Sequence, residues 1–125
     1  MSRIFDAPDP ITGLARFLEA KLAPAHQIDA TTWSFRSYSH LMTLKAEDIG
    51  LAETLLCRLS TDLGGLEQYE TTQLADLSLR VTLGAIRIND GSVALEHRFL
   101  YPTLKPEAIS RLVRLLNSSA NMFEP

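Results

Sequence analysis

Cys57, Glu96 and His97 are of the residue types that commonly take part in catalysis. A cysteine nucleophile needs a neighbouring base and a lowered pKa, whereas Cys57 lies inside an apolar run, where buried thiols are common. His97 has no second histidine or paired carboxylate at ligand spacing, and in a strand Glu96 points to the opposite face. We therefore interpret Cys57 and His97 as structural residues and predict that the protein is not an enzyme.

Two glycine-containing segments have some features of ligand-binding loops. The segment Asn89-Asp90-Gly91 lacks the additional oxygen ligands that calcium takes in a loop. The pair Gly64-Gly65 lacks the Lys-Ser/Thr that follows the glycines of a phosphate loop. A single cysteine excludes an internal disulfide and a cysteine-rich zinc site. We predict no metal and no cofactor.

Arginines in the last third of the chain offer a different chemistry, the binding of an anionic partner. They are Arg80, Arg87, Arg98, Arg111 and Arg114, while acidic residues gather between positions 47 and 76. A solvated face with scattered ion pairs explains the same pattern, and each exposed pair contributes only about 0–1 kcal/mol. The net charge of −3 and the pI near 5.5 argue against nucleic acid as the main partner.

Length and composition predict one domain over residues 10–125, preceded by a flexible tail at residues 1–9. The hydrophobic share of 46% is enough for a core. The chain begins without the apolar run of a signal peptide, and no stretch approaches the ~18 apolar residues of a membrane span. We therefore expect a cytoplasmic protein without membrane insertion.

The elements that would position these residues are clearest in the last third. Residues 85–88 and 93–101 alternate as strands around Asp90-Gly91, a strong signal for a hairpin turn. Pro106 suits the first turn of a helix, and an apolar stripe follows at helical spacing. The stripe comprises Ile109, Leu112, Val113, Leu116, Ala120 and Phe123, with Arg111, Arg114 and Asn117 away from it.

The first half of the chain predicts a helix at residues 10–22 and two strands, at 33–36 and 41–46. The segments 25–31 and 37–40 read as polar connections, which would expose His26 and His40. Residues 48–63 fit either a helix or a strand, because their leucines satisfy both spacings, and the stretch from Leu74 to Leu83 is divided in the same way. The element order is therefore α-β-β-β-α-β-β-α or α-β-β-α-β-β-α. Both are α+β folds with a mostly antiparallel sheet flanked by helices.

The run from Leu74 to Phe123 resembles the C-terminal half of the type III secretion chaperone-like fold, which includes the YbjN-type proteins. The shared features are a middle helix, a strand opened by Gly84, the Asp90-Gly91 turn, an apolar strand and a final amphipathic helix. The resemblance implies the first of the two orders, with residues 53–63 as a third strand and the second helix within 65–83.

This resemblance also implies a function and a set of contact residues. Such proteins are small, acidic bacterial homodimers that bind an extended segment of a client protein through apolar grooves without ATP. The implied client contacts are Leu14, Phe17, Trp33, Phe35, Met42 and Leu44, and the implied dimer contacts are Leu74, Leu77 and Val81. A small regulatory or ligand-sensing domain is the alternative on the same fold.

Overall fold

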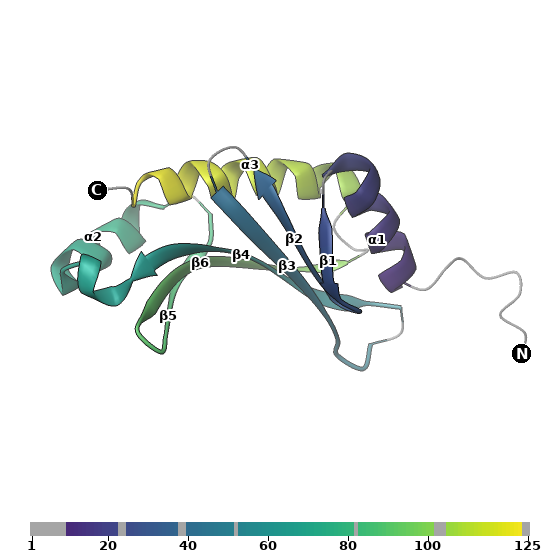
Figure 1. The fold of residues 1–125 in the computed structure, drawn as a ribbon, viewed down its shortest axis with the longest axis horizontal. Helices are drawn as coiled ribbons and strands as arrows, with labels where there is room; N and C mark the ends of the chain where they lie inside the picture. Colours follow the sequence, from purple (N-terminus) through teal and green to yellow (C-terminus); the bar gives the residue numbers. More distant parts are fainter. Residues whose placement is uncertain are drawn as a thin grey trace, which may run out of the picture.

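The computed structural model describes residues 10–22, 25–37, 40–51, 53–81, 83–101 and 105–123. Strands of one antiparallel sheet and three helices alternate along this part of the chain (Figure 1). The elements are α1 (Pro10–Lys21), β1 (His26–Asp29), β2 (Thr32–Ser37), β3 (His40–Asp48), β4 (Leu55–Gly65), the 3₁₀ helix η1 (Leu66–Gln68), α2 (Thr71–Arg80), β5 (Ala85–Asn89), β6 (Ser92–Tyr101) and α3 (Pro106–Asn121).

The six strands lie in the order β1-β2-β3-β4-β6-β5, and each neighbouring pair is antiparallel. The first four strands follow one another along the sheet. The chain then leaves through α2 and returns as the β5–β6 hairpin, which places β6 beside β4. These two long strands form the centre of the sheet, so residues from both halves of the chain meet there.

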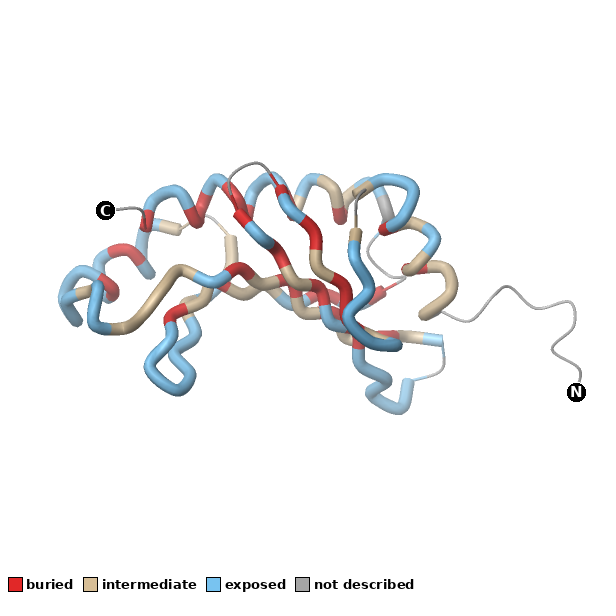
Figure 2. Tube along the Cα trace, in the orientation of Figure 1, coloured by how far each residue is buried: buried red, intermediate tan, exposed pale blue. Residues whose placement is uncertain are grey.

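Alternating side chains divide the sheet into a covered face and an open face. Along β3, Met42, Leu44 and Ala46 are buried, while Leu41 before Met42 and Lys45 between Leu44 and Ala46 are exposed. Helices α1 and α3 lie on the covered face, and buried and exposed positions alternate along the strands (Figures 1 and 2). The β5–β6 hairpin and the β3–β4 connection bend away from α3, so the open face is concave (Figure 1).

Apolar burial between the sheet and the helices stabilises this arrangement. Helix α1 contributes Leu14 and Leu18, which are fully buried, and α3 contributes Ile109 and Leu116, also fully buried. Burying side chains of this size contributes about 1.5–3 kcal/mol each. The buried apolar residues of the strands and helices form one cluster.

The structure confirms the predicted α+β class and resolves the ambiguity at residues 48–63 in favour of a strand. Cys57 and Leu59 pair with Phe99 and His97 on β6, so the helical alternative is wrong. The second helix, at Thr71–Arg80, lies within the predicted interval. The predicted tail at residues 1–9 lies outside the described residues.

One strand was not predicted. Residues 25–31 read as a polar connection, yet His26–Asp29 forms the edge strand β1 against β2. All its residues are exposed, so no apolar alternation marks it. Backbone pairing with β2 forms this strand, and a turn in which Thr31 donates to Asp29 closes it.

The predicted hairpin turn is confirmed by its backbone angles. Asp90 and Gly91 have φ values of +49° and +79°, as a turn with positive φ at both central residues requires.

Two expectations of exposure are wrong. His40 is 9% exposed and Asn117 6% exposed, because the two side chains meet between β3 and α3. His26 is exposed as expected.

Candidate functional site

Three basic side chains stand in a line across the centre of the open face. The strand register pairs Lys45 on β3 directly with Arg58 on β4, and Arg58 directly with Arg98 on β6. We call Lys45, Arg58 and Arg98 the cationic row. Like charges directly opposite one another on a sheet destabilise it, so a row of three costs folding free energy. An arrangement of this kind is typical of a surface that binds negative charge.

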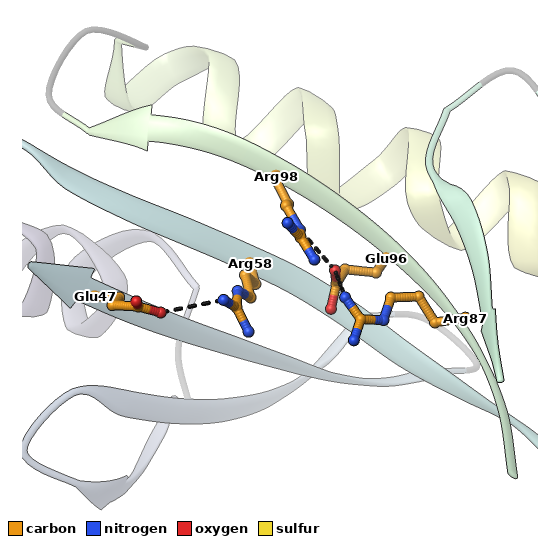
Figure 3. Close-up of polar contacts among 5 residues, drawn as sticks. All are labelled: Glu47, Arg58, Arg87, Glu96 and Arg98. Carbon is orange, nitrogen blue, oxygen red and sulfur yellow. Dashed lines mark hydrogen bonds and ion pairs between the residues drawn. The ribbon is translucent and has the colours of Figure 1, made fainter. Parts of the chain in front are cut away.

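Acidic side chains on the same face neutralise part of this charge (Figure 3). Glu47 Oε1 accepts a hydrogen bond from Arg58 Nη2 at 3.2 Å. Glu96 Oε2 accepts from Arg87 Nη1 at 3.1 Å and from Arg98 Nε at 3.0 Å. One oxygen of Glu96 thus serves two guanidinium groups. The side chain of Glu96 is only 14% exposed, so the two arginines largely surround it.

At the outer end of the row, Asp29 on β1 lies beyond Thr32, which pairs with Lys45. The pKa of Asp29 lies below its ordinary value, mainly because the backbone N–H of Thr31 donates to its carboxylate. The positive charge of Lys45 lowers this pKa further, as the smallest of the contributions. Asp29 therefore remains ionised and balances Lys45 only from a distance.

Arg58, at the middle of the row, carries an unused donor. Within the described residues its Nε is buried and has no hydrogen-bond partner, while its Nη2 bonds to Glu47. Its side chain as a whole is 33% exposed. A buried donor left without an acceptor costs about 1–3 kcal/mol, and this cost adds to the repulsion along the row.

An open hollow of about 550 Å³ adjoins the inner end of the row. It forms where β5 begins, because pairing between β5 and β6 starts at Ala85 and Glu96 and leaves the rest of β6 without this neighbour. Arg87, Arg98 and His97 line it. Burial lowers the pKa of His97, so this imidazole is neutral at neutral pH and the arginines supply the positive charge.

A second surface lies between helix α2 and the edge strand β5. A hollow of about 610 Å³ separates the two elements, and we call it the α2–β5 groove. Its lining comprises Leu66, Thr71, Leu74, Ala75, Ser78, Gly84, Ala85, Ile86 and Ile88. Ile88 is 56% exposed, and Leu79 on α2 is 86% exposed. Exposed apolar side chains beside an apolar hollow are characteristic of protein contacts.

The residues implied as client contacts lie mostly in the core. Five of them are at most 3% exposed, and Phe17 is half-buried. The five are Leu14, Trp33, Phe35, Met42 and Leu44. They pack between the sheet and the helices, so a client would reach them only after a covering helix had moved. Their role as client contacts stays a prediction.

The residues implied as dimer contacts lie at α2. Leu74 and Leu77 are 7% and 5% exposed and belong to the core, and Val81 is half-buried. Leu74 also lines the α2–β5 groove. The side chains of α2 that are free for a partner are its outward ones, above all Leu79. The dimer stays a prediction.

The residues first considered for catalysis do not converge. Cys57 is fully buried, and burial raises its pKa to about 12, which keeps the thiol protonated. Glu96 and His97 point to opposite faces of β6, and Glu96 is engaged by the two arginines. No group of metal-binding side chains is present among the described residues.

Comparison of this chain with protein-family models and with curated proteins finds no match. The fold and the two surfaces therefore carry the functional argument.

In the described part of the chain, no helix is both long and apolar enough to cross a membrane.

Sequence reasoning found the arginines of the hairpin but not the cationic row. The β3–β4 connection separates Lys45 from Arg58, and η1, α2 and β5 separate Arg58 from Arg98, so only the strand register aligns the three residues. The alternation contained a signal for this row, because Lys45 and Arg58 each stand between inward-facing apolar residues, and Arg98 stands between the inward-facing His97 and Phe99.

Proposed function

We propose that this protein is a non-enzymatic protein-binding domain that works as a homodimer, with the α2–β5 groove as the contact between its two copies. The observation that carries this proposal is the apolar groove with Leu79 and Ile88 exposed beside it. The resemblance to secretion chaperone-like proteins supports it and adds a bacterial, cytoplasmic setting and a client segment bound without ATP.

A second copy suits this surface because the patch contains both a projection and a hollow. Leu79 lies one helical turn after Ala75, which lines the groove, so it stands at the rim. In a twofold dimer the same patch meets itself. Leu79 of each copy then enters the groove of the other and covers Ile88, which removes both side chains from water.

Light scattering of the purified protein over a series of concentrations tests this dimer. We expect a dimer at micromolar concentrations and a monomer for Leu79→Glu, because a carboxylate would be buried at the centre of the contact. Leu115→Glu is the matched control, since Leu115 is 44% exposed on α3. A monomeric wild type, or a Leu79→Glu variant that stays dimeric, contradicts the proposal.

Ligand sensing is a second candidate, supported by a small pocket of about 180 Å³ between the sheet and the end of α3. His40, Asp62, Gln68 and Tyr69 give it polar walls. Native mass spectrometry of the purified protein tests this function. An adduct of defined mass that is absent from Gln68→Leu would favour sensing, and an unliganded mass under gentle conditions would count against it.

A further inference from the structure

We infer that the open face of the sheet binds an acidic, extended segment of a partner protein, with carboxylates of the segment seated on the cationic row. The cationic row contributes no side chain to the α2–β5 groove, although the hollow at the inner end of the row shares Gly84, Ala85 and Ile86 with it. The inference rests on the proposed protein-binding function only in its choice of a peptide as the occupant.

Charge is the first argument for an acidic occupant. Lys45, Arg58, Arg87 and Arg98 stand against Glu47 and Glu96, an excess of two positive charges. Counting Asp29 leaves an excess of one, whereas the whole chain carries −3. Farther along the open face, the positive charge of Arg36 and the negative charge of Asp62 cancel. The open face is therefore positive on an otherwise acidic protein, which favours a negative partner there.

The incomplete pairing of the guanidinium groups is the second argument. Arg87 and Arg98 share a single oxygen of Glu96, and Arg58 bonds to Glu47 through Nη2 alone. An arginine that binds a carboxylate with two parallel hydrogen bonds gains both strength and geometry. A carboxylate arriving from a partner can take up such donors, and it relieves the repulsion within the row at the same time.

The spacing of the row limits the shape of the segment. Neighbouring strands are about 4.8 Å apart, so the row from Lys45 to Arg98 spans about 10 Å. In an extended chain, side chains on one face recur every ~6.6 Å. Two carboxylates at alternate positions of a segment laid across the strands therefore fit on the row.

Apolar side chains border the cationic row on the open face. Leu56 and Leu100 are paired directly across β4 and β6, two residues along from Arg58 and Arg98 and on the same face. Leu100 is 38% exposed and Leu56 is half-buried. A segment that presents carboxylates at alternate positions to the row turns its intervening side chains away from the sheet, so Leu56 and Leu100 border the row without selecting those side chains. Nucleic acid fits less well, since a small excess of positive charge on a chain of net charge −3 can neutralise few phosphates.

Fluorescence anisotropy with two labelled peptides tests this inference on the full chain. In the first peptide Glu and Leu alternate, and in the second each Glu is replaced by Gln. We compare the wild type with Lys45→Gln/Arg58→Gln. The matched control is Arg111→Gln/Arg114→Gln, which removes the same charge from the exposed side of α3 on the opposite face. Circular dichroism verifies that each variant is folded.

We expect the wild type to bind the Glu peptide and not the Gln peptide, with an affinity that falls as salt rises. Lys45→Gln/Arg58→Gln should weaken binding at least about tenfold, and the α3 control should change it less than about twofold. Equal loss in both variants, equal binding of both peptides, or tighter binding of a single-stranded oligodeoxythymidine overturns the inference.

The same assay separates this inference from the proposed dimer. Leu79→Glu should bind the Glu peptide as tightly as the wild type, because Leu79 lies on α2 and lines neither the cationic row nor the hollow beside it. A protein that is monomeric but discriminates between the peptides refutes the dimer alone. A dimer that does not discriminate between them refutes the acidic segment alone.

Discussion

The imidazole Nδ1 of His40 lies 2.8 Å from the side-chain Oδ1 of Asn117, and both side chains are buried. With the amide oxygen as the acceptor, Nδ1–H of His40 is the donor. This bond links strand β3 to helix α3 across 77 positions of the chain. This bond is a polar contact within the apolar layer between the sheet and α3. It therefore favours one position of α3 on the sheet.

Asn117→Ala should destabilise the protein by about 1–3 kcal/mol, because it leaves the buried Nδ1–H of His40 without this acceptor. Chemical denaturation measures the loss. Ser118→Ala is the control, since Ser118 is the exposed neighbour on the same helix and should change stability by less than about 0.5 kcal/mol. Equal stabilities of the two variants would show that the bond contributes nothing.

Cys57 should make stability depend on pH in the alkaline range. Burial raises its pKa from 9.0 to about 12, so between these values the unfolded chain releases a proton that the folded protein retains. The free energy of unfolding therefore falls as pH rises, by at most about 1.4 kcal/mol per pH unit. Burial also raises the pKa of Tyr101, which acts in the same direction.

Urea denaturation at about pH 7 and about pH 10 measures this loss. The thiol should also resist a disulfide reagent until the protein unfolds, since the thiolate is the reacting form. In Cys57→Ala the loss between the two pH values should be smaller and come from the remaining groups. An unchanged loss in that variant would refute the assignment to Cys57.

Gly84→Ala should destabilise the protein more than Gly91→Ala does. Both residues have positive φ, +94° and +79°, which costs an alanine about 1–2 kcal/mol. At Gly84 the added Cβ would also lie 3.1 Å from the backbone oxygen of Glu96 and 3.1 Å from Leu116 Cδ1, whereas nothing lies within 4 Å at Gly91. Thermal denaturation of both variants should show a lower midpoint for Gly84→Ala, and the reverse order would contradict this packing.

Lys45→Thr should stabilise the protein by about 0.2–1 kcal/mol, because it removes a positive charge directly opposite Arg58 and places a residue suited to strands there. The gain should shrink in about 1 M salt, where the Debye length is about 3 Å. Denaturant titrations at low and high salt measure both effects. A loss of stability in Lys45→Thr would show that the positive charges of the cationic row do not repel one another measurably.

Local signals in the sequence determined several elements of this protein. The Asp90-Gly91 turn, the alternation on either side of it and the apolar stripe after Pro106 each specify their own conformation, because positive φ and side-chain periodicity act over a few residues. The order α-β-β-β-α-β-β-α follows from these signals with the resemblance, and the structure adds only β1. That strand has no apolar side chain facing the core to mark it.

Tertiary structure decided what depends on the register between distant strands. Leu55, Leu59 and Leu63 satisfy both a helical and a strand spacing, and only the pairing of β4 with β3 and β6 selects the strand. The meeting of His40 with Asn117, and the alignment of Lys45, Arg58 and Arg98, join residues that share no local pattern. Burial of the covered face sets the positions of Lys45, Arg58 and Arg98. When the apolar residues of a strand face the core, the alternate side chains lie on the open face.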